Sequence, residues 1–218
     1  SLYKELITDH IWSKNRHEYG FKNLESHHLM TSFFGTPYID VRVDFNSWIP
    51  RELDIGISTK LINFYLKKFN RNKNLHDKVE FEILFTCFTA KTIKRLENDL
   101  SNKFTRLEIK KIKNSLININ KIAFKASKRD SNKIEILKEK QRELINSKMY
   151  SLNKIYYLIE DCKKFGTLPF AGLARCGFIA VDILNSFVET NILTIEEKNK
   201  YLNSIRNIAT KINEDFVK

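Results

Sequence analysis

The sequence is poor in the features that mark disulfide scaffolds and membrane spans. Its 218 residues include only three cysteines, Cys87, Cys162 and Cys176, an odd number with no CxxC spacing. Such cysteine usage is typical of a reduced protein, so the sequence predicts a cytoplasmic location. No uninterrupted run of about 18 apolar residues is present, which predicts no transmembrane helix and no membrane partner.

Several signatures of catalysis are also missing. The sequence contains no P-loop, no GxGxxG fingerprint, no Ser-His-Asp pattern and no HExxH motif. His27 and His28 are adjacent, but neighbouring side chains on a strand point to opposite faces, and no third ligand follows at a recognisable spacing. The sequence therefore predicts no metal site in this chain.

Acidic residues are outnumbered by basic ones, 26 to 38, which gives a formal net charge of +12. A strongly basic chain can bind nucleic acid or an anionic membrane. Here the excess is spread along Lys-, Asn- and Ile-rich sequence, so a compositional bias explains it and no nucleic-acid partner is expected. A non-catalytic helical module that binds nucleic acid or a protein through residues 91–159 is the alternative.

One segment has a clear strand pattern with charges on it. Between residues 38 and 46 the apolar side chains would point one way, because side chains alternate along a strand. Four polar side chains would point the other way: Asp40, Arg42, Asp44 and Asn46. The pattern predicts a strand with one core face and one polar face.

A second segment, residues 78–87, repeats the alternation and places Glu80 and Glu82 on its polar side. With a short candidate strand at 28–34, the two segments predict a small antiparallel sheet. Arg42 and the two glutamates would then share one face within cross-strand reach. Such a row is either an ion-pair ladder or the floor of a site.

The rest of the chain has the apolar spacing of amphipathic helices. Expected helices are an opening helix at 2–18, a helix at 58–69, a long hairpin at 91–159 that turns at 126–132, and a closing helix through Ile205, Ile208 and Ile212. The predicted fold class is α+β and mostly helical, with the small sheet packed against helices. Residues 1–90 and 160–218 would form the core domain, and 91–159 an arm.

Arg175 is an anomaly in a segment that is otherwise apolar or small from residue 170 to 181. A guanidinium keeps its charge when buried, so it must meet a carboxylate or a phosphate. Asp182 lies about 10 Å away along a helix axis, too far for an easy pair. The partner is therefore expected to be one of the strand glutamates or a bound anion.

Four separated blocks resemble the central domain of bacterial phosphoenolpyruvate-synthase-like, PEP-utilising enzymes. They are SLYKELITD (1–9), GTPYIDVR with FNS (35–42 and 45–47), HDKVEFE (76–82), and GTLPFA with LAR (166–171 and 173–175). The family resemblance implies an N-terminal ATP-grasp domain that holds ATP and Mg, a swivelling phosphohistidine domain, and a central domain that holds the phosphoryl acceptor. This chain would be that central domain, a fragment of a longer enzyme, inactive alone and without its own cofactor.

The resemblance further implies an L-glutamine acceptor in capsular phosphoramidate biosynthesis. The reaction would convert ATP, L-glutamine and water into glutamine phosphorylated on its amide nitrogen, AMP and phosphate. Pyruvate or another small acid is the alternative acceptor.

An amino-acid acceptor presents charged groups that a buried site must match. We expect Arg42 or Arg175 to bind the carboxylate, and Glu80 or Glu82 to bind the ammonium. The competing interpretation is structural, with Arg42 and Glu80 as a cross-strand ion pair.

The amide end of the acceptor needs orientation and a base. We expect Asn46, Ser47 or Asp40 to orient the amide. Because an amide nitrogen is a poor nucleophile, Asp40 or Glu82 is the candidate general base for phosphoryl transfer.

Overall fold

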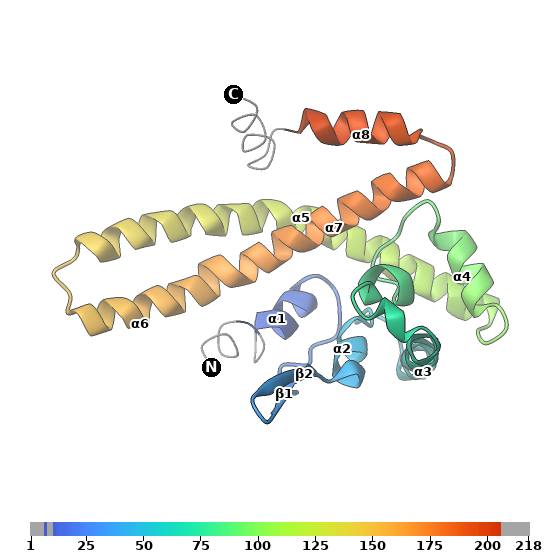
Figure 1. Cartoon of the computed structure of the whole chain (residues 1–218), viewed down its shortest axis with the longest axis horizontal. Coiled ribbons are helices and arrows are strands. Elements are labelled where there is room, and N and C mark those ends of the chain that lie inside the picture. The colour runs from blue at the N-terminus through green and yellow to red at the C-terminus, as the bar shows by residue number, and fades with distance from the viewer. Residues whose placement is uncertain (1–6, 8–10, 206–218) are drawn as a thin grey trace.

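The computed structural model describes residue 7 and residues 11–205, and Figure 1 shows a mostly helical chain with one small sheet. The α-helices are α1 (Ile11–Glu18), α2 (Val41–Ser47), α3 (Ile55–Arg71), α4 (Thr92–Leu100), α5 (Arg106–Asn146), α6 (Ser151–Asp161), α7 (Leu168–Glu189) and α8 (Ile195–Ser204). The strands are β1 (Met30–Phe33) and β2 (Thr36–Ile39). The predicted class, a mostly helical α+β protein, is confirmed.

β1 and β2 form a tight antiparallel hairpin. Met30 pairs with Ile39 at the open end, and the turn residues Phe34 and Gly35 have positive φ angles of 49° and 79°. Positive φ at both central residues is the geometry of a type I′ turn, in which glycine is favoured. The strand predicted at 28–34 is therefore present in shortened form, although nearly all of the hairpin is exposed.

The strand predicted at 38–46 is wrong beyond the end of β2. Asp40 caps α2 instead, and its Oδ1 accepts hydrogen bonds from the backbone N–H groups of Arg42 at 2.9 Å and Val43 at 3.0 Å. Phe45 on the helix, and Trp48 and Ile49 directly after it, are buried in the core. The apolar residues fit the helical period as well as the strand period, and the cap decides between them.

The strand predicted at 78–87 is also wrong. Val79–Ile83 is a π-helical turn, and the following residues pair with no strand in the described part of the chain. The guanidinium of Arg95 replaces a sheet partner and donates to three backbone carbonyl groups, those of Phe81, Glu82 and Leu84, at 2.9, 2.8 and 3.0 Å. A period-2 pattern cannot reveal a distant side chain that satisfies the backbone.

The long hairpin consists of α5 and the continuous run from α6 to α7 (Figure 1). Its turn lies at residues 147–150, so the turn predicted at 126–132 is wrong. Ala126 and Asp130 are buried along α5, because this polar-looking stretch continues the packed face of the helix. A π-helical turn, Cys162–Thr167, joins α6 to α7.

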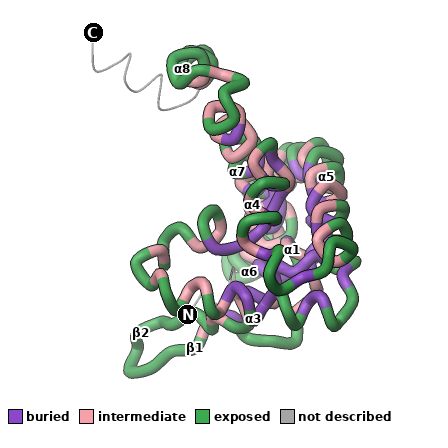
Figure 2. Tube along the Cα trace, turned by 90° about the vertical axis from the view of Figure 1, so that its right-hand side faces the viewer, coloured by how far each residue is buried: buried purple, intermediate pink, exposed green. Residues whose placement is uncertain are grey.

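The core lies where α2, α3, α4 and residues 83–87 meet α7 and the first half of α5. Its cluster includes Phe21, Phe45 and Tyr65, together with Ile112 and Leu116 from α5. Figure 2 shows buried residues around α1 and α3, whereas α8 and the β-hairpin are exposed. The division into a core domain (1–90 and 160–218) and an arm (91–159) stays a prediction, and α5 contributes side chains to the core.

Parts of two predicted helices lie outside the described residues. These parts are residues 2–6 and 8–10 of the opening helix, and Ile208 and Ile212 of the closing helix. The closing helix begins as α8 after Thr194, whose side chain forms a capping box with Glu197. This start agrees with the Thr-x-x-Glu spacing in the sequence.

Loss of the α2 cap is expected to destabilise the chain modestly. Asp40→Ala removes the acceptor for two backbone N–H groups and should lower the free energy of unfolding by about 1 kcal/mol. Asp40→Asn, which retains a capping oxygen, should change it much less. Urea denaturation of both variants checks the assignment, and an equal loss in both would contradict it.

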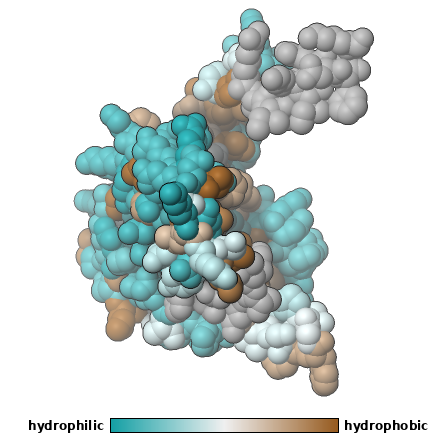
Figure 3. Space-filling view, turned by 90° about the vertical axis from the view of Figure 1, so that its left-hand side faces the viewer, coloured by the Kyte–Doolittle hydropathy of each residue, from teal (hydrophilic) through white to brown (hydrophobic). Residues whose placement is uncertain are grey.

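One helical run in the described chain, Ser151–Glu189, is long and apolar enough by composition to cross a membrane. Charged residues such as Arg175 interrupt it, which is why a search for an unbroken apolar run misses it. Only 28% of its apolar window is buried in the structure, and α7 packs against α1 and α5. Figure 3 shows a largely hydrophilic surface on one side of the molecule, with separate hydrophobic patches.

Candidate functional site

Arg175 is buried in α7, with 5% of its surface exposed. Its Nη1 forms an ion pair with the carboxylate of Glu80, and its Nη2 donates a hydrogen bond of 2.8 Å to the backbone carbonyl of Thr86. Glu80 belongs to the π-helical turn and Thr86 to the extended residues after it. Of the two partners considered from the sequence, a glutamate or a bound anion, the structure shows the glutamate.

A second guanidinium, from Arg16, lies beside this pair. Arg16 Nη1 donates to Asp44 Oδ1 at 2.7 Å and to the hydroxyl of Ser47. Asp44 and Ser47 are three residues apart on α2, so they present both acceptors on one helix face. The sequence analysis missed Arg16, and the spacing of Arg16 one turn after Trp12 would have been the only local signal.

The indole of Trp48 connects the two ion pairs. Arg16 Cζ lies 4.0 Å and Arg175 Cζ 4.7 Å from the Trp48 ring centroid. Stacking of a desolvated cation on a tryptophan face stabilises a structure by about 2 kcal/mol. We call this group the Trp48 cluster: Arg16, Asp44, Ser47, Trp48, Glu80 and Arg175.

Burial is the main influence on the protonation of both arginines. It lowers the pKa of Arg16, while the nearby Asp44 carboxylate acts in the opposite direction. It lowers the pKa of Arg175 to about 9, and the positive charge of Arg16 adds to this effect. Both guanidiniums remain protonated at neutral pH. Asp44 offsets the charge of Arg16, and Arg175 has Glu80 in its ion pair and the Asp182 carboxylate, which acts to raise its pKa.

The cluster is partly open to solvent through its acidic side. The side chains of Asp44 and Glu80 are 18% and 24% exposed, and that of Arg16 is 15% exposed. Among the described residues, three buried atoms have no hydrogen-bond partner: Arg175 Nε, Trp12 Nε1 and Glu80 Oε1. Trp12 lies in contact with Arg16, whose Cζ is 5.0 Å from its ring. A ligand from solvent would therefore first meet the carboxylates of Asp44 and Glu80 and the guanidinium of Arg16, because these side chains are the partly exposed ones.

The structure brings together three of the predicted site residues, Ser47, Glu80 and Arg175. The other four lie elsewhere on the same segments: Asp40, Arg42, Asn46 and Glu82. Asp40, Arg42 and Glu82 are exposed, and Asn46 donates to the backbone carbonyl of Arg42 within α2 at 2.9 Å. The predicted cross-strand pair of Arg42 with Glu80 does not form in the described chain, because neither segment is a strand there.

A buried polar network supports α7 one turn before Arg175. The hydroxyl of Tyr19 donates to Asp130 Oδ2 at 2.8 Å, and Arg129 Nε donates to Asp130 Oδ1 at 2.9 Å. Burial and the Asp130 carboxylate both raise the pKa of the Tyr19 hydroxyl, so it stays protonated and remains a donor. Gly172 of α7 lies against this network and leaves room for it.

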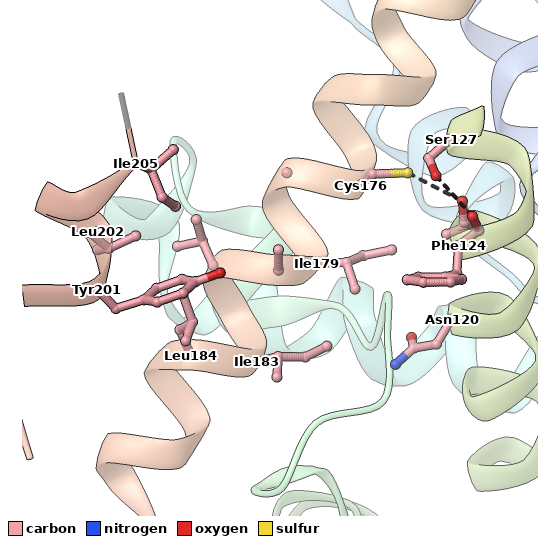
Figure 4. A pocket seen from close by; sticks show the side chains of 14 residues that line it. Asn120, Phe124, Ser127, Cys176, Ile179, Ile183, Leu184, Tyr201, Leu202 and Ile205 are labelled. Carbon is pink, nitrogen blue, oxygen red and sulfur yellow. Dashed lines mark hydrogen bonds between the residues drawn. The ribbon is translucent and has the colours of Figure 1, made fainter. Parts of the chain in front are cut away.

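An apolar pocket of about 560 Å³ lies on the other side of α7 (Figure 4). Side chains of α8, including Tyr201 and Leu202, lie on one side of it, and Phe124 of α5 lies on the other. Asn120 in its wall is already bonded through both ends of its amide to the backbone of Phe88. The described residues that line the pocket include no charged side chain, so this lining does not suit a zwitterionic ligand.

Among the residues that the structure describes, no three His, Cys, Asp or Glu side chains are grouped closely enough to hold a metal ion. Comparisons with protein-family models, with curated proteins and with solved structures find no match to this chain.

Proposed function

We propose that this chain is the acceptor-binding central domain of an ATP-dependent phosphotransferase whose acceptor is L-glutamine. The observation that carries the proposal is the buried pair of Arg175 and Glu80 beside Trp48. Both residues belong to blocks of the sequence that resemble the phosphoenolpyruvate-synthase-like enzymes. The proposal joins that resemblance to a specific place in the fold.

The pair suits the backbone end of a free amino acid. Arg175 has a planar set of N–H donors that matches a carboxylate, and its Nε has no hydrogen-bond partner among the described residues. Glu80 is the more exposed member of the pair and can accept the ammonium group. A zwitterion placed across the pair exchanges one charge-assisted contact for two, and every charged group keeps a partner.

The neighbouring domains of the parent enzyme would supply the rest of the reaction. An ATP-grasp domain would hold ATP and Mg, and a phosphohistidine domain would carry the phosphoryl group to the acceptor. This chain would contribute acceptor binding and in-line placement, which are the main requirements of phosphoryl transfer. The enzyme would work in the cytoplasm, with neither nucleic acid nor a membrane as partner.

Titration calorimetry of the 218-residue chain with L-glutamine tests the proposal. We expect saturable binding of L-glutamine, and weaker binding of pyruvate, which lacks an ammonium group. Glu80→Gln should weaken binding at least tenfold, about 1.4 kcal/mol, because the ammonium loses its ionic partner.

Glu82→Gln is the matched control for this experiment, because Glu82 lies on the same π-helical turn with an exposed side chain. Its affinity for L-glutamine should stay within about twofold of wild type, a difference of about 0.4 kcal/mol. Absence of binding by the folded wild-type chain would refute the proposed function. An equal loss in both variants would move the site away from Arg175.

A further inference from the structure

Arg16 and Asp44 form a second ion pair, in which Arg16 stacks on the Trp48 ring. The acceptor-binding role described above does not use this pair. Both side chains are partly exposed, at 15% and 18%, so a ligand can reach them from solvent. Both guanidiniums contact one indole, with Cζ atoms 4.0 and 4.7 Å from the Trp48 ring centroid, so the two Cζ atoms lie no more than about 9 Å apart. A small ligand held at one pair would extend toward the other.

The contacts of Arg16 leave hydrogen-bonding capacity on both members of its pair. To the described residues Arg16 donates only through Nη1, and a guanidinium has five N–H donors in all. Asp44 accepts from Arg16 through Oδ1, and no described residue donates to its Oδ2. A donor and an acceptor therefore lie side by side at the edge of the cluster.

We propose that the Arg16–Asp44 pair recognises the side-chain amide of the acceptor and selects glutamine over glutamate; this rests on the proposed function. A primary amide presents one carbonyl acceptor and an NH₂ donor next to each other. Arg16 donates to the carbonyl oxygen, and Asp44 Oδ2 accepts from the NH₂ group. Ser47 holds Arg16 in place through its hydroxyl.

The same pair rejects a carboxylate at that position. The side chain of glutamate carries only acceptor oxygens and a negative charge, which would face the carboxylate of Asp44 without a proton between them. Specificity built on such a repulsive element is common where two ligands have the same shape. Asp44 is therefore a specificity-determining residue and Arg16 a binding residue.

A specificity switch tests this assignment. Calorimetry with L-glutamine and L-glutamate gives an affinity ratio for the wild-type chain and for Asp44→Asn. The asparagine removes the negative charge and adds N–H donors, so the ratio should fall at least tenfold toward glutamate. Asp40→Asn, the same change at the N-cap of α2, should leave the ratio unchanged because asparagine caps as well as aspartate.

Arg16→Lys provides a second variant if Asp44→Asn lowers the stability too far for titration. Lysine keeps the charge and loses the planar donor set, so the affinity for glutamine should fall about tenfold. Wild-type binding of glutamine with an unchanged ratio in Asp44→Asn and unchanged affinity in Arg16→Lys would overturn this inference and leave the proposed function standing. No binding by the wild-type chain would overturn both.

Discussion

Replacing Arg175 by alanine is expected to lower the free energy of unfolding by about 3–5 kcal/mol, the usual cost of breaking one side of a buried ion pair. The change leaves the carboxylate of Glu80 without its guanidinium and the carbonyl of Thr86 without its donor. It also removes the cation stacked on Trp48. Urea denaturation followed by far-ultraviolet circular dichroism measures the loss.

Arg42→Ala is the control for this variant, because Arg42 is exposed and only its backbone takes part in the hydrogen bonds of α2. Exposed substitutions of this kind usually change stability by no more than about 0.5 kcal/mol. A loss below about 1 kcal/mol in Arg175→Ala would contradict the buried pair, since it falls far short of the cost of an uncompensated buried charge.

The second large effect is expected at Gly172. A Cβ atom at this position would lie 2.5 Å from Tyr19 Oη and closer still to Asp130 Oδ2. Gly172→Ala therefore forces α7 away from the Tyr19–Asp130 hydrogen bond, and overpacking of this kind costs about 1–3 kcal/mol. Loss of the buried hydrogen bond adds about 1 kcal/mol or more.

Gly177 offers a matched control on the same helix. A Cβ atom there has open space around it, so Gly177→Ala should be neutral or stabilise the chain by up to about 1 kcal/mol through helix propensity. If the close approach at Gly172 is real, Gly172→Ala lowers the temperature of thermal unfolding, whereas Gly177→Ala leaves it unchanged or raises it. Equal shifts would show that the network does not restrict this helix.

The helices of this protein were largely predictable from sequence, because apolar spacing and capping residues act locally. The Thr194 capping box and the helix expected at 58–69 are examples, and the latter is contained in α3. The two segments that were wrongly predicted to be strands have apolar side chains that fit the helical period as well as the strand period. At 38–46 the N-cap formed by Asp40 favours a helix. At 78–87 the guanidinium of Arg95, which is distant in sequence, donates hydrogen bonds to the backbone.

Prediction of the candidate site was limited for the same reason. Arg175 could be predicted to need an acidic partner, because a charge in an apolar segment cannot stay unpaired. Its choice of Glu80 depends on how the π-helical turn packs against α7, which no local pattern encodes. Arg16 was missed because its role appears only when α1 and α2 lie together around Trp48.

The most direct test of the central claim uses the two tryptophans of the chain, Trp12 and Trp48, which both contact Arg16. Two-dimensional NMR of the ¹⁵N-tryptophan-labelled chain should show two indole N–H signals. If the Trp48 cluster binds the acceptor, L-glutamine will shift the Trp48 signal in a saturable manner, and Glu80→Gln will weaken that response. An unchanged Trp48 signal at glutamine concentrations that saturate the calorimetric binding would place the acceptor elsewhere and contradict the account.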